Sequence, residues 1–130
     1  MAEEIPDARA EHEKAVLNQA AGQAAYGVHT RFTAQTGDAD TLTEMLLAAA
    51  RALESNADCL LYVVSRAPDD PDTIYVTEAW SSQEAHDASL QREEVQATIR
   101  QARPLIAGIT GTEMRPVGGK GLSISPPSSS

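Results

Sequence analysis

A carboxylate, an indole and an imidazole lie close together in the middle of the chain, at Glu78, Trp80 and His86. An imidazole with an unperturbed pKa of about 6.5 takes up a proton near neutrality, so His86 is a candidate general base. Trp80 is the only tryptophan, and its ring could wall a pocket for a flat aromatic substrate. Core packing explains a single tryptophan equally well. This segment is the first candidate for a site.

The sequence around these residues predicts a strand that runs directly into a helix. Residues 73–80 alternate with the two-residue period of a strand, which places Glu78 and Trp80 on the same face. Ser81, followed three residues later by Glu84, has the pattern of a capping box. A short helix over about 82–90 is therefore expected to carry His86.

Two further candidates lie on other predicted strands. Residues 25–35 alternate in the same way and predict a first strand that carries His29, a second possible base. Three tyrosines could orient a substrate hydroxyl, and among them Tyr62 is slightly favoured. An isolated histidine is more often only solvated, and a strand tyrosine is often a packing residue.

The remaining elements follow from periodicity and from helix and turn signals. Thr41 and Glu44 predict a capped helix start, and an apolar face follows at three- and four-residue spacing: Leu42, Met45, Leu46, Ala49, Ala50 and Leu53. Residues 59–66 predict a second strand, joined to 73–80 by the Pro- and Asp-rich turn at 68–72. A further helical stretch has one apolar face, ends at Pro104 and Gly108 and precedes a last strand at about 109–116; its face comprises Val95, Ile99, Ala102 and Ile106.

The order strand, helix, strand, strand, helix, strand predicts an α+β fold of the ferredoxin-like, split βαβ type, with an antiparallel sheet covered by helices on one face. The other face of the sheet would be left open to water. A two-fold dimer that presses two such sheets together would cover it. We therefore expect a homodimer.

The composition argues against several classes of function. The chain has 130 residues with 42% hydrophobic content, which suits one globular core, and a formal net charge of -9. That charge argues against nucleic acid and anionic membranes as partners, because binding phosphates requires clustered Lys and Arg. No apolar run is long enough to span a bilayer, and the start Met1-Ala2-Glu3-Glu4 lacks the features of a signal peptide. A cytoplasmic protein is expected.

The sequence predicts neither a metal nor an organic cofactor. The single cysteine, Cys59, has no companion for a disulfide or a zinc site. No Gly-rich nucleotide loop follows a strand, which disfavours flavin and NAD. Outside the core domain, expected at 25–117, we predict a partly helical extension at 1–24 and a flexible tail at 118–130.

With these elements in this order, the run from Glu78 to His86, the upstream Asp58-Cys59-Leu60-Leu61-Tyr62 and the Asp-Pro hairpin resemble the antibiotic-biosynthesis monooxygenase family over about residues 25–117. The resemblance implies a dimeric α+β barrel formed by two ferredoxin-like sheets. Members include cofactor-independent oxygenases of anthrones, quinols and naphthols, and also haem-degrading enzymes. The shared fold raises the expectation of an oxygenase without establishing one.

The resemblance adds one candidate residue, and at two positions this sequence departs from the family's pattern. Arg100 lies twenty residues after Trp80, where anthrone oxygenases tend to carry an arginine, and could stabilise a phenolate or peroxide anion. A solvated charge on the polar face of the helix is the simpler explanation of it. The anthrone oxygenases commonly carry asparagine at the position of Val76, and haem-degrading members often carry histidine at the position of Ser89.

These observations favour a cofactor-independent monooxygenase that oxidises a phenolic, quinol or anthrone-like aromatic of the polyketide type with O2. In this hypothesis Trp80, Tyr62 and Glu78 bind substrate, His86 or His29 is the base, and Arg100 stabilises the anion. Two alternatives remain. The chain could be a non-catalytic dimeric binding or assembly module, or a polyketide cyclase that uses the same pocket without oxygen.

Overall fold

Strands β2 (Cys59–Arg66) and β3 (Thr73–Trp80) begin and end where the sequence predicts. They pair as an antiparallel hairpin, and side-chain hydrogen bonds close the turn between them. In that turn the two carboxylate oxygens of Asp70 accept hydrogen bonds from the Asp72 amide and the Thr73 hydroxyl, at 3.0 and 2.7 Å.

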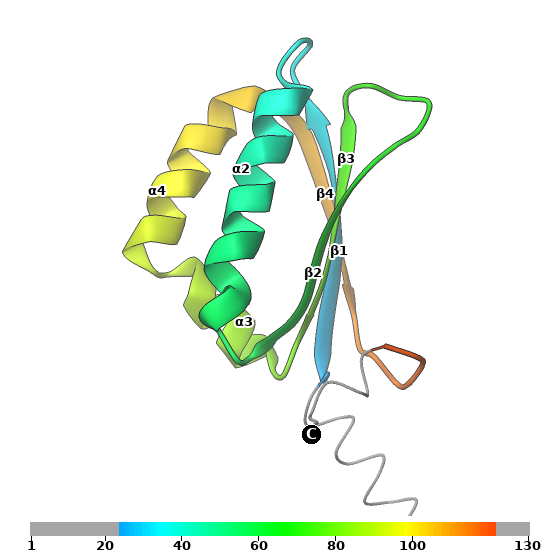
Figure 1. Ribbon diagram of the computed structural model, residues 1–130, viewed down its shortest axis with the longest axis vertical. Coiled ribbons are helices and arrows are strands. Elements are labelled where there is room, and N and C mark those ends of the chain that lie inside the picture. The colour runs from blue at the N-terminus through cyan, green and yellow to red at the C-terminus, as the bar shows by residue number, and fades with distance from the viewer. Residues whose placement is uncertain (1–23, 122–130) are drawn as a thin grey trace, which may run out of the picture.

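The computed structural model describes residues 24–121 as a single antiparallel sheet with its helices on one face (Figure 1). The strand order is β2-β3-β1-β4, and every neighbouring pair is antiparallel. This is the predicted ferredoxin-like α+β arrangement. The other elements are β1 (Tyr26–Ala34), α2 (Ala39–Ala52), η1 (Leu53–Ser55), α3 (Gln83–Leu90), α4 (Glu93–Ala102), η2 (Arg103–Leu105) and β4 (Ile106–Met114).

Helix α2 begins earlier than the sequence predicts. Its N-cap is Asp38, whose side chain makes no capping hydrogen bond, so the predicted capping box at Thr41 and Glu44 is wrong. Gly37, at a φ of +88°, adopts the left-handed conformation that reverses the chain directly after β1. The helix can therefore start at Ala39.

Strand β4 also begins early. Pro104 lies in η2, a 3-10 helix of one turn. Because proline has no backbone N–H to continue the helical hydrogen bonds, helix α4 ends there. Ile106 then has extended backbone angles and opens β4, so its predicted place on the helical face is wrong. The predicted apolar face of this helix is otherwise present, with Ala102 buried against α2 and the sheet.

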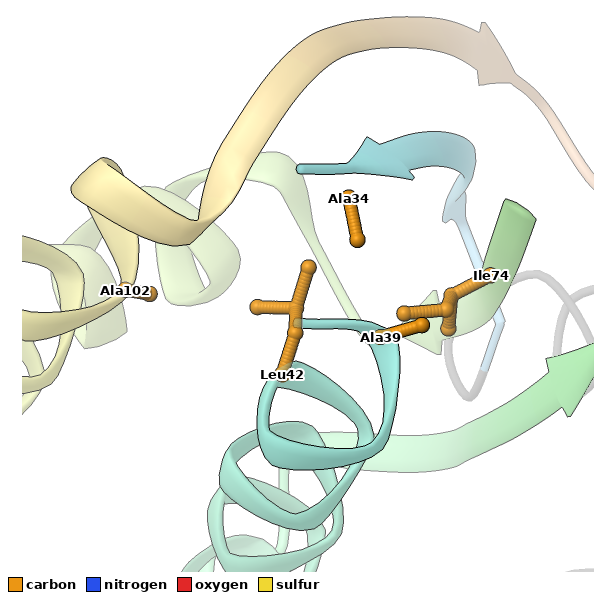
Figure 2. Close-up of a cluster of buried hydrophobic side chains, with 5 residues drawn as sticks. All are labelled: Ala34, Ala39, Leu42, Ile74 and Ala102. Carbon is orange, nitrogen blue, oxygen red and sulfur yellow. The ribbon is translucent and has the colours of Figure 1, made fainter. Parts of the chain in front are cut away.

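Two buried clusters hold the helices on the sheet. The first contains Ala34, Ala39, Leu42, Ile74 and Ala102, and it lies between α2, α4 and the strands (Figure 2). Leu42 and Ile74 are fully buried in it. The second cluster, at the other end of the sheet, contains Tyr26, Val28 and Trp80, with Leu53, Cys59 and Ala85 packed against it.

The open face of the sheet is the one away from the helices. Because side chains alternate along β1 and β3, it carries His29, Arg31, Tyr75 and Thr77. Helices α2 and α4 lie side by side on the opposite face (Figure 1). Within residues 24–121 no helix or strand covers the open face.

Helix α3 is capped by Ser82, one residue after the predicted cap. The Ser82 hydroxyl accepts a hydrogen bond from the Ala85 amide at 3.0 Å. Ser81 instead donates its hydroxyl proton to Asp58 at 2.6 Å and so ties the start of the helix to the segment before β2.

Removal of this cap should destabilise the fold. Ser82→Ala is expected to lower the free energy of unfolding by about 1 kcal/mol, because an amide in the first turn loses its partner. Urea denaturation would measure the loss. The matched variant Ser81→Ala loses only an exposed hydrogen bond and should cost less; the reverse order would mean that Ser81 is the cap.

The structure bears only in part on the predicted ends of the chain. Residues 118–121 form no helix or strand. The predicted extension at 1–24 lies outside the described residues except for Ala24, and so does most of the predicted tail. In residues 24–121 no helix is both long and apolar enough to cross a membrane.

Candidate functional site

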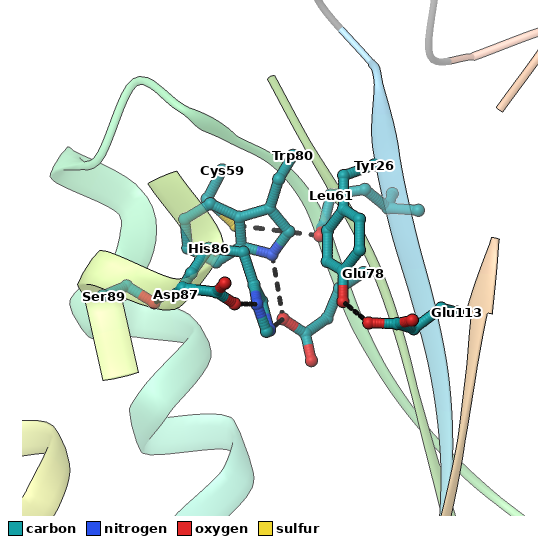
Figure 3. A network of polar contacts seen from close by, with 9 residues as sticks. All are labelled: Tyr26, Cys59, Leu61, Glu78, Trp80, His86, Asp87, Ser89 and Glu113. Carbon is teal, nitrogen blue, oxygen red and sulfur yellow. Dashed lines mark hydrogen bonds and ion pairs between the residues drawn. The ribbon is translucent and has the colours of Figure 1, made fainter. Parts of the chain in front are cut away.

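Glu78, Trp80 and His86 meet between the end of β3 and helix α3 (Figure 3). The Trp80 Nε1 donates a hydrogen bond of 2.9 Å to Glu78 Oε1. His86 Nε2 lies 3.8 Å from the same oxygen. The indole and imidazole rings are perpendicular, with centroids 5.4 Å apart. The sequence-predicted neighbours on β3 and α3 therefore form one contact network.

Burial controls the charge of Glu78. Its side chain is only 13% exposed, and this loss of solvent raises the pKa of the carboxyl above its usual value. The hydrogen bond from Trp80 and the nearby His86 oppose that rise. Since the folded pKa exceeds the unfolded one, the carboxyl favours folding most at low pH. That contribution is lost as the pH rises through the raised pKa.

Both nitrogens of His86 face carboxylates. Nδ1 lies 3.0 Å from Asp87 Oδ1, and Nε2 faces Glu78. When Nδ1 carries the proton and donates it to Asp87, the lone pair of Nε2 is left to accept one. The imidazolium that results would lie between two carboxylates, so the network suits a proton-accepting role for His86.

Tyr26 and Glu113 complete the network from β1 and β4. The Tyr26 ring lies 5.1 Å from the His86 ring, and its hydroxyl donates a hydrogen bond of 2.8 Å to Glu113 Oε2. Burial, together with that hydrogen bond, raises the pKa of Tyr26 to about 12. Tyr26 therefore stays protonated and fixes one side of the imidazole.

Strand β2 brings Tyr62 and Cys59 to the same region. Tyr62 is the cross-strand partner of Glu78, and Cys59 is that of Trp80. Burial, with a further contribution from the Glu78 charge, raises the pKa of the Tyr62 phenol and raises that of the Cys59 thiol to about 11. Both groups are therefore neutral at pH 7.

The shifted thiol should be slow to alkylate. A pKa of about 11 instead of 9.0 lowers the thiolate fraction near pH 8 about a hundredfold. Iodoacetamide is therefore expected to modify Cys59 in the folded protein about a hundredfold more slowly than in urea, as followed by intact mass. Equal rates would contradict a buried, neutral thiol.

Two predicted site residues lie away from this network. His29 is on the open face of the sheet, where its ring stacks on Tyr75 at 5.4 Å and Nδ1 lies 3.0 Å from the Thr77 hydroxyl. Arg100 is exposed in the last turn of α4 and forms no ion pair with any residue in 24–121. The structure therefore brings four of the six predicted residues together: Tyr62, Glu78, Trp80 and His86.

Sequence reasoning missed Asp87 and Glu113 as parts of the network. The signal for Asp87 was present, because a carboxylate directly after a candidate base can bind the free nitrogen of its ring. Glu113 could not be found without the register of β4, which pairs it with Val28. Among the described residues no three His, Cys, Asp or Glu side chains are grouped as metal ligands.

The structure is a ferredoxin-like α+β domain with a network of polar and aromatic contacts between its sheet and helix α3. A family model for antibiotic biosynthesis monooxygenases matches residues 25–101, and the chain belongs to that family. No curated protein matches the chain.

Solved structures agree with this assignment. A protein of Chloroflexus aurantiacus J-10-fl with the provisional name antibiotic biosynthesis monooxygenase is 42% identical, with a TM-score of 0.69, over 76% of this chain and 99% of that one. A Caulobacter crescentus CB15 protein with the same provisional name is 21% identical, with a TM-score of 0.68, over 83% and 99%. A Pseudomonas aeruginosa protein is 20% identical, with a TM-score of 0.68, over 75% and 98%. The latter two show the fold alone.

Proposed function

We propose that the protein is a cofactor-independent monooxygenase that uses O2 to oxidise an aromatic substrate with an acidic phenolic O–H or anthrone-type C–H. The observation that carries this proposal is the arrangement of His86, with Nδ1 3.0 Å from Asp87 Oδ1 and Nε2 3.8 Å from Glu78 Oε1, so that a proton taken up by the ring would lie between two carboxylates. Family membership supports the reaction class. Independence of metal and flavin stays a prediction.

The proposed reaction needs only a base and a water-poor site. His86 Nε2 removes the substrate proton, and Asp87 and Glu78 stabilise the imidazolium. The substrate anion then reduces O2 by one electron, and recombination of the two radicals forms a peroxide on the ring. Loss of water from this peroxide leaves the ketone or quinone. For an anthrone the CH2 and O2 become C=O and H2O, so atoms and electrons balance.

The proposal includes a homodimer built on the open face of the sheet. That face exposes Val63 and Met114 beside its polar strand residues, and a second copy would cover it. His29 and Tyr75 would then lie in the interface. The base role of His29, the anion-stabilising role of Arg100 and the cytoplasmic location stay predictions.

Oxygen uptake tests the function. Purified protein treated with a chelator is expected to consume O2 with at least one member of a panel of anthrones, naphthols and quinols, in proportion to ketone or quinone formed. Uptake that requires an added metal or flavin would refute the cofactor-free reaction. The absence of uptake by folded protein across the panel would refute oxygenation of these substrates.

A binding or assembly module is the second candidate. Trp80 is 1% exposed and packed into a buried cluster, as expected of a residue that serves only the core. Such a module would bind aromatic ligands or a protein partner without consuming O2. Deleting residues 1–24 and 118–130 would abolish partner binding by a module, whereas an oxygenase would keep its turnover. A cyclase would convert substrate with no oxygen uptake.

A further inference from the structure

Glu113 reaches the His86 network from the edge strand β4. The register of β4 on β1 places Glu113 opposite Val28, so its side chain lies on the helix face of the sheet, diagonally across from Tyr26. The Tyr26 hydroxyl donates its proton to Glu113 Oε2 at 2.8 Å. This bond lies at the opposite end of the network from Asp87 (Figure 3). A residue of β4 is thus tied to a ring that contacts His86.

Two aromatic rings contact the imidazole of His86, whose side chain is 12% exposed. The Trp80 ring is perpendicular to it, with centroids 5.4 Å apart, and the Tyr26 ring is tilted by 48° at 5.1 Å. Burial fixes the Trp80 ring, and so does the hydrogen bond from its Nε1 to Glu78. The orientation of His86 therefore depends on what fixes the Tyr26 ring.

The Tyr26 ring has a single polar tether. Within residues 24–121 its hydroxyl has no hydrogen-bond partner besides Glu113. A hydrogen bond to an ionised carboxylate is roughly twice as strong as one between neutral groups. Tyr26 is 8% exposed, so loss of the acceptor would leave a buried hydroxyl unpaired, which is unfavourable. The ring would then turn to satisfy its hydroxyl elsewhere.

A purely structural tie between β1 and β4 is the simpler explanation of the Tyr26–Glu113 bond. The two strands, however, are already paired along the backbone from Gly27 to Ala34. Glu113 itself is exposed and packs in neither buried cluster. The bond is therefore not needed to join the strands, whereas it does fix the ring beside His86.

We propose that Glu113 is a positioning residue for His86. From strand β4 it holds the Tyr26 hydroxyl, and the Tyr26 ring in turn keeps the imidazole in the orientation in which Nε2 faces Glu78 and Nδ1 faces Asp87. The geometric part of this inference holds whatever the protein catalyses. Its kinetic part rests on the proposed function, in which His86 is the base.

NMR of the histidine ring C–H groups tests the geometry without turnover. The His86 signals are those that disappear in His86→Gln. Ring currents of Tyr26 and Trp80 displace them from the positions of free histidine at the same pH. Glu113→Ala and Tyr26→Phe should each shift them toward those positions. The double variant should shift them no further than either single variant, because both substitutions remove the same bond.

Glu113→Gln is the conservative variant. Its amide oxygen accepts the same hydrogen bond, so the His86 signals should stay close to those of the unmodified protein. Glu44→Ala is the matched control for loss of one charge. Glu44 is exposed on α2 and has no ion-pair partner in the part of the chain that the structure describes, so its removal should leave the His86 signals unchanged. Tyr26→Phe, which is near-isosteric, keeps the test valid if Glu113→Ala does not fold.

Oxygen uptake provides the kinetic arm. Glu113→Ala should lower kcat about 10–100-fold, the effect of displacing a catalytic group by up to about 1 Å, and Glu113→Gln should restore most of that loss. Unmoved His86 signals in both Glu113→Ala and Tyr26→Phe would overturn the inference, as would a shift in Glu113→Gln as large as in Glu113→Ala. Moved signals with an unchanged kcat would overturn the positioning of the base. Moved signals without uptake by the unmodified protein would overturn the oxygenase alone.

Discussion

His86→Ala is expected to lower the rate of oxygenation by about 10²–10⁴-fold, the range that a positioned general base contributes. The reason is the pair of contacts described above, in which Asp87 holds Nδ1 and leaves Nε2 to take the substrate proton. Steady-state oxygen uptake would measure kcat and KM separately. The loss should fall on kcat, because the imidazole acts on the proton rather than on the ring.

Asp87→Asn refines this expectation. This variant should keep the fold, since Asp87 is exposed. It weakens the hydrogen bond that Asp87 accepts from the Nδ1 proton of His86 and should lower kcat less than His86→Ala does. His29→Gln is the matched control, because His29 lies on the opposite face of the sheet. A greater loss in His29→Gln than in His86→Ala, with the oligomeric state unchanged, would make His29 the base.

Trp80→Ala is expected to cost about 3–5 kcal/mol of unfolding free energy. The ring is 1% exposed and lies at the centre of the second buried cluster. Single domains are stable by only about 5–15 kcal/mol, so this variant should be near its unfolding threshold. Urea denaturation at fixed protein concentration would measure it.

The exposed Leu90, at 37%, provides the control, and Leu90→Ala should cost far less. Trp80→Phe separates packing from hydrogen bonding. It removes the Nε1 donor that holds the pKa of Glu78 down, so that pKa should rise further. Trp80→Phe should therefore lower the free energy of unfolding more at pH 7 than at pH 4. An equal decrease at the two pH values would mean that Glu78 carries no charge in the native protein at pH 7.

The spacing of apolar residues predicted the helices and strands that bury one face, because burial of that face requires apolar side chains at the period of the element. Strand β3 alternates and β2 is a short apolar run, and the turn at 68–72 separates them clearly, so both were predicted to the residue. The start of α2 was missed because the left-handed Gly37 lets the helix begin before the apparent cap at Thr41. Ser82 was missed because two consecutive serines offer the same chemistry.

The site was predictable only where its residues are neighbours in sequence. Glu78, Trp80 and His86 follow from one strand and one helix turn. The contact between Tyr26 and Glu113 needs the register of β1 against β4, which local patterns do not encode. Arg100 shares its helix with core residues, but its exposure depends on how α4 is rotated on the sheet.

The two sides of strand β3 have different structural surroundings. Glu78 and Trp80 face the helices, whereas Thr77, which precedes them, pairs with His29 on the other side. Substitutions at even positions can thus alter chemistry while odd positions keep the surface that a second copy would contact. Deletion of a single residue in β3 would exchange the two sets, so we expect descendants of this sequence to diverge by substitution and almost never by changes of length within this strand.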